Sequence, residues 1–177
     1  MCVIETTPRI ETRRLTLRAP HPQDAPRLAQ LCNDPEIARM TATMPSPYAL
    51  EDAQAFIDRC AAADPRHHAP MVIDLDDEGL VGGLGFHSKG PGPVEVGYWI
   101  GAPFRGRGYA SEALIGAMTW AARGWRRRVV AAGHFSDNPA SGVVLCRAGF
   151  LYTGEVRLQT SLGRPEAAPS RRMIWLA

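Results

Sequence analysis

The chain has 177 residues, of which 45% are hydrophobic and 21% are charged. These proportions are close to those of an average globular protein and exclude disordered and collagen-like chains. A chain of this length buries about 70% of the surface that it exposes when unfolded, so we expect a single folded domain over residues 1–177. Lys plus Arg number 20 and Asp plus Glu 18, and the net charge of +2 gives no electrostatic basis for dedicated nucleic-acid binding.

The four cysteines lie far apart in the sequence, without a Cys-x-x-Cys pair or a histidine at metal-ligand spacing. They are Cys2, Cys32, Cys60 and Cys146. Although four cysteines could pair in a secreted protein, their spacing favours reduced thiols, a cytoplasmic location and no bound metal. The sequence also has no run of about 20 apolar residues, so we expect no membrane span.

The first part of the chain predicts one strand and two helices. Basic and apolar side chains alternate over Arg14–Arg18, which is typical of a half-buried strand. Apolar residues at helical spacing predict helices over Pro22–Leu31 and Leu50–Ala62. Between these helices, two prolines within Met40–Tyr48 predict a loop.

Three strands are expected next, at Met71–Leu75, Leu80–Phe86 and Val94–Ile100. An acidic turn that ends in Gly79 separates the first two, and a Gly/Pro-rich joint at residues 89–93 separates the second from the third. Because both connections are short, we expect the three strands to form an antiparallel meander.

The clearest amphipathic helix runs from Ala110 to Ala121, where small and apolar residues recur at i, i+3, i+4 and i+7. Gly124 is expected to end it. The apolar run Val129–Ala132 then predicts a strand covered on both faces. A strand, a helix and a strand in this order imply a crossover connection, so the two strands should be parallel.

A shorter helix is expected over Asn138–Ala148, with Asn138 as its N-cap, Pro139 at its first position and Gly149 after its end. Two closing strands and a polar loop between them are expected at Phe150–Val156, Met173–Leu176 and residues 162–170. The element order predicts an α+β fold with a mixed sheet.

A strand, a Gly-rich loop and the start of the clearest helix follow one another over Val94–Ala110. Gly106 and Gly108 lack Cβ, so backbone N–H groups can approach an anion, and the helix N-terminus adds about half a positive charge. A pyrophosphate would fit there. The spacing excludes a Walker loop and a Rossmann fingerprint, which makes ATP and NAD poor candidates. Two alternatives stay open: the glycines only make a tight turn, or they bind the phosphate of another nucleotide.

The segment Arg105-Gly106-Arg107-Gly108-Tyr109-Ala110 matches the Q/R-x-x-G-x-G/A signature, and with it the chain resembles the GCN5-related N-acetyltransferases (GNATs). The resemblance extends over nearly the whole chain, through Glu11–Arg18, Glu95–Ile100, Asn138-x-x-Ser141 and Gly149-Phe150. Within the family the chain is similar to the Rim-type ribosomal-protein N-terminal acetyltransferases, which also have a Thr-x-Arg-Leu-x-Leu-Arg strand and a Gly-Tyr-Trp-Leu/Ile segment before the loop.

This resemblance implies a mixed, mostly antiparallel twisted sheet with a splayed central strand pair and flanking helices. It implies acetyl-CoA as co-substrate, with its pyrophosphate on the loop amides and its acyl arm in the gap between the splayed strands. An amide near Trp99 would stabilise the oxyanion. The residues that the resemblance assigns to binding are Trp99, Ile100, Arg105, Gly106, Arg107, Gly108, Tyr109, Ala110, Asn138 and Ser141.

Two side chains are the catalytic candidates, Glu95 and Ser141. Strand alternation places Glu95 on the same face as Gly97, where it could take a proton from an acceptor amine through water or instead pair with an arginine. By the resemblance, Ser141 protonates the leaving thiolate, since Leu145 stands where many family members have the tyrosine that does so. Tyr152 is a weaker substitute for that tyrosine.

The resemblance implies acetyl transfer to a primary amine by direct attack in a ternary complex. An α-amine with a pKa of about 7.7–8.0 is partly neutral at pH 7.4, whereas a lysine amine near 10.4 is almost fully charged. No second carboxylate is evident beside Glu95, so we expect a protein or peptide N-terminus as acceptor, with a small-molecule amine as the alternative. An inactive CoA-binding sensor module is the alternative to an enzyme, and a homodimer stays open.

Overall fold

The computed structural model describes residues 8–88 and 90–177, so Cys2 and Lys89 lie outside the described residues. Within this part of the chain, eight strands form one sheet in the order β1-β2-β3-β4-β5-β6-β8-β7. The strands are β1 (Ile10–Glu11), β2 (Leu15–Arg18), β3 (Ala69–Leu75), β4 (Gly79–His87), β5 (Val94–Ile100), β6 (Val129–Phe135), β7 (Leu151–Gln159) and β8 (Ala168–Leu176). The helices are α1 (Ala25–Cys32), α2 (Pro35–Met40), α3 (Leu50–Ala61), α4 (Tyr109–Arg123) and α5 (Pro139–Arg147), with 3-10 turns η1 (Pro22–Asp24) and η2 (Ala102–Phe104).

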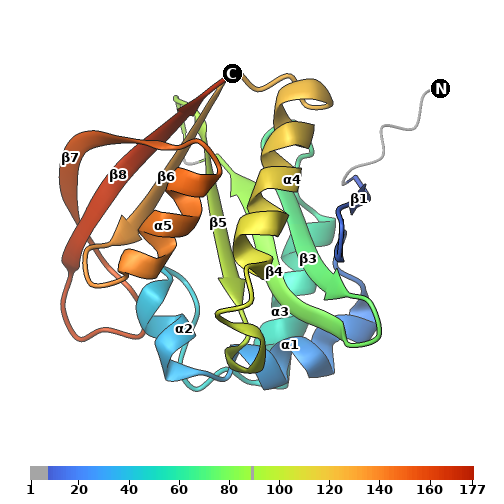
Figure 1. The fold of residues 1–177 in the computed structure, drawn as a ribbon. Helices are drawn as coiled ribbons and strands as arrows, with labels where there is room; N and C mark the ends of the chain where they lie inside the picture. Colours follow the sequence, from blue (N-terminus) through green and yellow to red (C-terminus); the bar gives the residue numbers. More distant parts are fainter. Residues whose placement is uncertain (1–7, 89) are drawn as a thin grey trace.

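Neighbouring strands pair antiparallel except β5 and β6, which are parallel because α4 connects them as a crossover. Helices α4 and α5 lie on one face of the sheet, and α1 and α3 lie behind it (Figure 1). None of these described helices is long and apolar enough to cross a membrane. The expected α+β fold with a mostly antiparallel sheet is confirmed.

The sequence patterns missed α2, which lies in the segment between the first two predicted helices. Six residues are too few to show an apolar helical period, so only its cap could have revealed it. The side chain of Asp34 accepts a hydrogen bond from the N–H of Glu36, and Pro35 occupies the first helical position. The dipeptide Asp34-Pro35 was therefore the available signal.

Two further predictions need correction in the C-terminal part of the chain. Strand β8 begins at Ala168, so the polar loop is shorter than the predicted range 162–170. Strand β6 is covered on one face only, because Val130 and Ala132 are buried whereas Val129 is 36% exposed. The apolar run was wrongly interpreted as buried on both faces, since helices cover only one side of β6.

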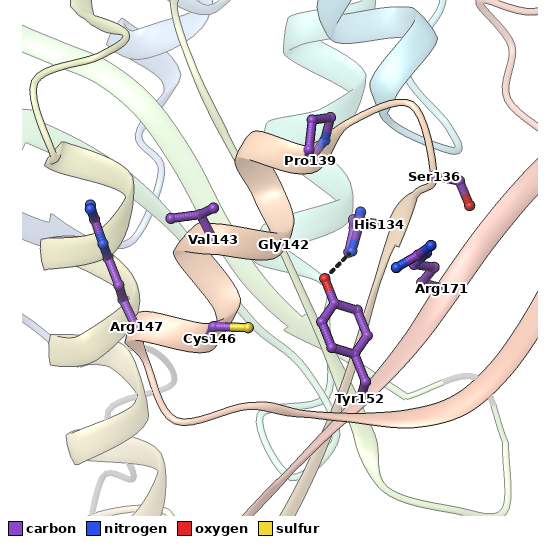
Figure 2. A pocket seen from close by; sticks show the side chains of 9 residues that line it. All are labelled: His134, Ser136, Pro139, Gly142, Val143, Cys146, Arg147, Tyr152 and Arg171. Carbon is purple, nitrogen blue, oxygen red and sulfur yellow. Dashed lines mark hydrogen bonds between the residues drawn. The ribbon is translucent and has the colours of Figure 1, made fainter.

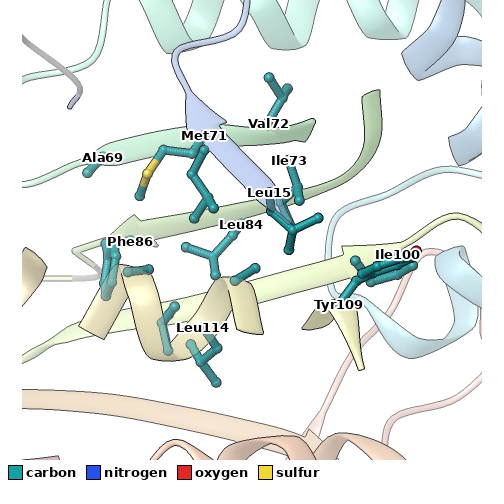
Figure 3. Packing of buried hydrophobic residues seen from close by; sticks show 14 of the residues in the cluster. Leu15, Ala69, Met71, Val72, Ile73, Leu84, Phe86, Ile100, Tyr109 and Leu114 are labelled. Carbon is teal, nitrogen blue, oxygen red and sulfur yellow. The ribbon is translucent and has the colours of Figure 1, made fainter. Parts of the chain in front are cut away.

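The hydrophobic core lies between the sheet and its helices and draws on strands β2 to β5 and on α4 (Figure 3). Leu15 and Leu17 are both buried, as the alternation in this strand predicts. Leu114 and Ala117 of α4 have no exposed surface, and burying one leucine side chain stabilises a fold by roughly 1.5–3 kcal/mol. This packing fixes the start of α4 beside the end of β5, where the Gly-rich loop joins them.

Three of the four cysteines are described, and all three are free thiols, as predicted. Burial raises the pKa of Cys32 to about 12 and that of Cys60 to about 11. Both thiols therefore stay protonated at neutral pH and are poor nucleophiles.

Candidate active site

The Gly-rich loop between β5 and α4 has the backbone that its sequence predicts. Gly106 and Gly108 have φ angles of +75° and +80°, in the left-handed region that glycine adopts without the penalty of a Cβ. Gly108 is the N-cap of α4, so free N–H groups of the first helical turn meet the positive end of the helix dipole there. A Cβ on Gly106 would meet no atom within 4 Å. The loop therefore has the geometry of an anion-binding site.

A carboxylate that the sequence analysis did not single out ties this loop to the N-terminal strands. Glu112, in the first turn of α4, accepts hydrogen bonds of 2.7 Å from Thr12 Oγ1, Arg14 N and Arg14 Nε. Arg14 Nη1 also donates to Arg107 O at 3.2 Å. Burial alone would raise the pKa of Glu112, but these hydrogen bonds and the Arg14 charge lower it below its usual value. The sequence feature that could have identified Glu112 is its acidic side chain in the first turn of a helix, where negative charge is favoured.

Arg105 supports the same loop from its other side. Its Nε donates to Ile100 O at 3.0 Å, and its Nη2 lies 2.6 Å from Asp34 Oδ2. The Arg105 side chain is 41% exposed, so part of it stays open to solvent. Arg105 thus links the end of β5 to the N-cap of α2.

Strands β5 and β6 diverge beside the loop. The two strands pair only at Val94 with Val130 and Glu95 with Ala131 within the described residues. Both strands then continue without pairing to each other, as far as Ile100 and Phe135. The structure confirms the splayed central pair, and an extended acyl arm can pair with the exposed edge of β5.

Trp99 and Ile100 take opposite sides of β5 at this open end. Ile100 is 8% exposed and belongs to the core, so it presents its backbone to the gap. The indole of Trp99 packs against β4, where a Cβ on Gly83 would lie 2.6 Å from its Nε1. Tyr109 is also buried, beneath the Arg14 guanidinium at 4.6 Å. Tyr109 therefore contributes its N–H to the loop, while its side chain packs inward.

The first turn of α5 brings Asn138 and Ser141 together. Asn138 Oδ1 accepts a hydrogen bond from Ser141 N at 3.2 Å and is the N-cap of the helix. Tyr98 reaches the same turn from β5, and its hydroxyl oxygen lies 2.8 Å from Ser141 Oγ. The sequence analysis gave Tyr98 no role. The sequence feature that could have identified Tyr98 is strand alternation, which places it on the face of β5 opposite Glu95.

Glu95 forms a two-pronged ion pair with Arg172 of β8. The distances are 2.9 Å between Nη2 and Oε2 and 3.2 Å between Nη1 and Oε1. Both side chains are mostly buried, with 14% of Arg172 and 15% of Glu95 exposed. The pairing with an arginine, considered above as the alternative, is therefore present, while the role of Glu95 as a base stays a prediction.

Leu145 is 1% exposed, so this position of α5 points into the core. Tyr152 instead lines an open hollow of about 630 Å³ on the other side of the helix (Figure 2). Its hydroxyl lies 2.9 Å from His134 Nε2, while His134 Nδ1 lies 2.8 Å from Phe135 O and donates to it. No residue of the described loop Arg105–Ala110 lines this hollow, so the hollow is separate from the Gly-rich loop.

Comparison with known proteins matches this architecture over most of the chain. The family model for the acetyltransferase (GNAT) domain matches residues 14–151. The N-acetyltransferase YoaA of Bacillus subtilis is 28% identical over 154 residues, which are 85% of this chain and 86% of that protein. A ribosomal-protein-serine acetyltransferase of Escherichia coli is 30% identical over 107 residues, but this match spans only 59% of either protein.

Solved structures show the same fold at lower sequence identity. The structure of RimL, a ribosomal L7/L12 alpha-N-protein acetyltransferase in complex with coenzyme A, has a TM-score of 0.84 at 22% identity and covers 96% of this chain and 98% of its own. The self-immunity acetyltransferase MccE, in complex with acetyl-CoA and AMP, has a TM-score of 0.82 at 19% identity over 99% and 100% of the two chains.

Proposed function

Because the chain belongs to the GNAT acetyltransferase family, we propose that it transfers the acetyl group of acetyl-CoA to a primary amine, with a protein or peptide N-terminus as acceptor. The observation that supports this most is the divergence of β5 and β6 directly beside the left-handed glycines of the loop. Together they offer a phosphate site and an unpaired strand edge, which a phosphorylated donor with an extended acyl arm requires.

The backbone holds most of the donor in this proposal. The N–H groups at the start of α4 bind the pyrophosphate, and the edge of β5 near Trp99 and Ile100 pairs with the arm of the donor. An N–H group of β5 near Trp99 donates to the thioester oxygen, where negative charge develops during attack. Fixed backbone donors of this kind contribute several kcal/mol to transition-state stabilisation.

The ion pair of Glu95 bears on which amine can be the acceptor. Two guanidinium N–H groups of Arg172 already bind this carboxylate, so Arg172 competes with an acceptor amine for its negative charge. A lysine amine must lose a proton from a group with a pKa of about 10.4, whereas an α-amine near 7.7–8.0 is partly neutral already. This comparison favours an N-terminal amine, because such an amine depends least on Glu95 for the removal of its proton.

Ser141 is the proposed proton donor to the departing thiolate. Its hydroxyl lies in the first turn of α5, next to the N-cap Asn138 and across from the open end of β5. Leu145 is buried and has no proton to give, and the Tyr152 hydroxyl is engaged with His134 in the hollow. Among these candidates Ser141 is the one whose hydroxyl faces the open end of β5, where it lies 2.8 Å from the hydroxyl of Tyr98.

The acceptor is tested with labelled acetyl-CoA and a matched peptide set. One peptide has a free N-terminus and a blocked lysine, the second has a blocked N-terminus and a free lysine, and small amines form the third arm. We expect thiol release with the free N-terminus to be the fastest. Faster release with the lysine peptide would overturn the acceptor assignment, and CoA binding without release for every amine would favour the sensor module.

A further inference from the structure

Tyr98 and Ser141 are in contact although 43 positions separate them in the sequence. The phenol oxygen of Tyr98 lies 2.8 Å from Ser141 Oγ and 3.0 Å from Ser141 O. Tyr98 comes from the part of β5 that has left β6, and Ser141 comes from the helix that follows β6. The contact therefore bridges the two sides of the splayed pair.

The proton count of this contact allows two arrangements. Tyr98 has one hydroxyl proton and can donate it either to the carbonyl oxygen or to the hydroxyl oxygen of Ser141. When Tyr98 donates to the carbonyl, the serine proton points back at the phenol oxygen. When Tyr98 donates to Oγ, the serine proton is released toward the gap between β5 and β6.

Resting on the function proposed above, we propose that Tyr98 is a positioning residue that holds the Ser141 hydroxyl with its proton available to the departing thiolate. A serine on a helical first turn otherwise samples several staggered rotamers, and Asn138 holds only its backbone N–H. Tyr98 supplies the phenol that α5 lacks at Leu145, from a different element and acting through Ser141.

The ionisation of Tyr98 suits this role. Burial raises the pKa of Tyr98 well above its usual value, although the hydrogen bond to Ser141 acts in the opposite direction. Tyr98 therefore keeps its proton at every pH at which the reaction is run. A hydroxyl that stays protonated always has a proton that it can donate to Oγ.

The positions of these groups determine where each proton goes when the thiol leaves. The amine nitrogen forms a bond to the carbonyl carbon and loses a proton to water. The carbon–sulfur bond breaks with its electron pair on sulfur, and the sulfur takes the proton of Ser141 Oγ. Tyr98 keeps its own proton and donates a hydrogen bond to the oxygen that has lost one. Water returns a proton to Ser141 after the thiol has left.

The test is a double-mutant cycle of Tyr98→Phe and Ser141→Ala under conditions in which chemistry limits turnover. We expect Tyr98→Phe to lower kcat roughly 2- to 12-fold, as one hydrogen bond of about 0.5–1.5 kcal/mol would, and to leave KM for acetyl-CoA unchanged. In the Ser141→Ala background, Tyr98→Phe should have no further effect on kcat. Tyr48→Phe removes a hydroxyl from another buried tyrosine and should leave kcat unchanged.

Four outcomes would overturn the inference. Equal losses from Tyr98→Phe with and without Ser141 would show that Tyr98 acts independently, and a rise in KM alone would make it a donor-binding residue. If wild type is active and Ser141→Ala is impaired, full kcat in Tyr98→Phe would show that Tyr98 does not position Ser141. The proposed function would then still stand. Wild-type protein that binds acetyl-CoA but acetylates no amine would overturn the proposed function and this inference with it.

Discussion

Individual residues decide whether the loop can bind a phosphate group. Gly108 combines a positive φ with the N-cap position of α4, so its conformation sets the direction of the N–H groups that follow. The nearest atom to a Cβ on Gly108 is Arg14 Nη2 at 3.6 Å, an ordinary contact distance. A side chain at this position would therefore fit against the protein but would be strained and would stand in the loop.

We expect Gly108→Val to raise the Kd for CoA roughly 100-fold or more, equivalent to about 2.7 kcal/mol. A branched side chain disfavours φ of +80° and occupies the approach to the loop amides. Gly154→Val is the matched control, because Gly154 has φ of +83° and also has open space around its Cβ, but lies in β7. Calorimetric titration with CoA measures both variants, and equal affinities would remove the loop from the site.

A second single-residue prediction concerns Gly142 in α5. A Cβ here would lie 2.5 Å from the Tyr152 hydroxyl and 2.9 Å from His134 Nε2. We expect Gly142→Ala to destabilise the fold by about 1–3 kcal/mol, as overpacking does. Adding Tyr152→Phe to Gly142→Ala removes the closest atom and should restore part of the loss. Chemical denaturation measures the series, and no recovery in the double variant would contradict this account.

Among the elements, the connection between β7 and β8 is fixed on α2. Ser161 Oγ donates to Ala38 O at 2.7 Å, and Arg164 Nε donates to Arg39 O at 2.9 Å. Arg164 and Arg39 also share the carboxylate of Asp137, which directly precedes the N-cap of α5. The β7–β8 connection and α2 are far apart in sequence, but they pack against each other next to the first turn of α5.

We expect Gly163→Ala to detach this connection from α2. A Cβ on Gly163 would lie 2.5 Å from the backbone of both Ala38 and Arg39, and backbone atoms cannot move aside as a side chain can. The loss should be about 1–3 kcal/mol of unfolding free energy, together with faster proteolysis of the connection. Leu162→Ala is the control, since this side chain is 64% exposed, and a loss as large there would contradict the docking.

The elements that hold the site were more predictable than the contacts between them. The range of β5, the loop glycines and the cap of α5 each have a local signal, namely alternation, the need for positive φ and the Asn138-Pro139 pair. The pairing of Glu95 with Arg172 has no such signal, because 77 positions separate them. Only the strand order β5-β6-β8 brings these two side chains together.

At the scale of the whole molecule, Arg18 joins β2 to two other parts of the chain. It binds the carboxylate of Asp24 with two hydrogen bonds of 2.8 and 2.9 Å and that of Asp74 in β3 at 2.5 and 3.1 Å. Burial alone would raise the pKa of Asp24, but the hydrogen bonds from Arg18 and His21 and the charge of Arg18 lower it. The folded state therefore favours ionised Asp24.

A carboxyl group whose pKa is lowered by folding adds stability above its unfolded pKa, here about 3.8, and loses this contribution as the pH falls through the folded value. We therefore expect the stability gap between wild type and Asp24→Asn to be largest near neutral pH and to shrink below about pH 4. Denaturant unfolding from pH 3 to 7 measures it. A gap that stays constant with pH would contradict the assignment.

Asp64→Asn is the control for this pH series. The hydrogen bonds of Arg66 lower the pKa of Asp64 to about 2, yet the two residues are only two positions apart and lie at the surface, with 39% of the Asp64 side chain and 81% of the Arg66 side chain exposed. Such a local pair also forms in the unfolded chain, so the pKa differs little between the two states. We expect Asp64→Asn to leave the pH dependence of stability nearly unchanged.

The divergence of β5 and β6 places a strand edge in the middle of the sheet. An unpaired edge at the margin of a sheet invites pairing with another chain. The unpaired edge of β5 instead faces β6 of the same sheet and lies beside α4 and α5 (Figure 1). Alternate amides of residues 96–100 should therefore exchange their hydrogens with solvent faster than the amides of β4, which pairs on both sides. Bound CoA should slow that exchange, so protection of this short stretch would report occupancy of the gap independently of any catalysis.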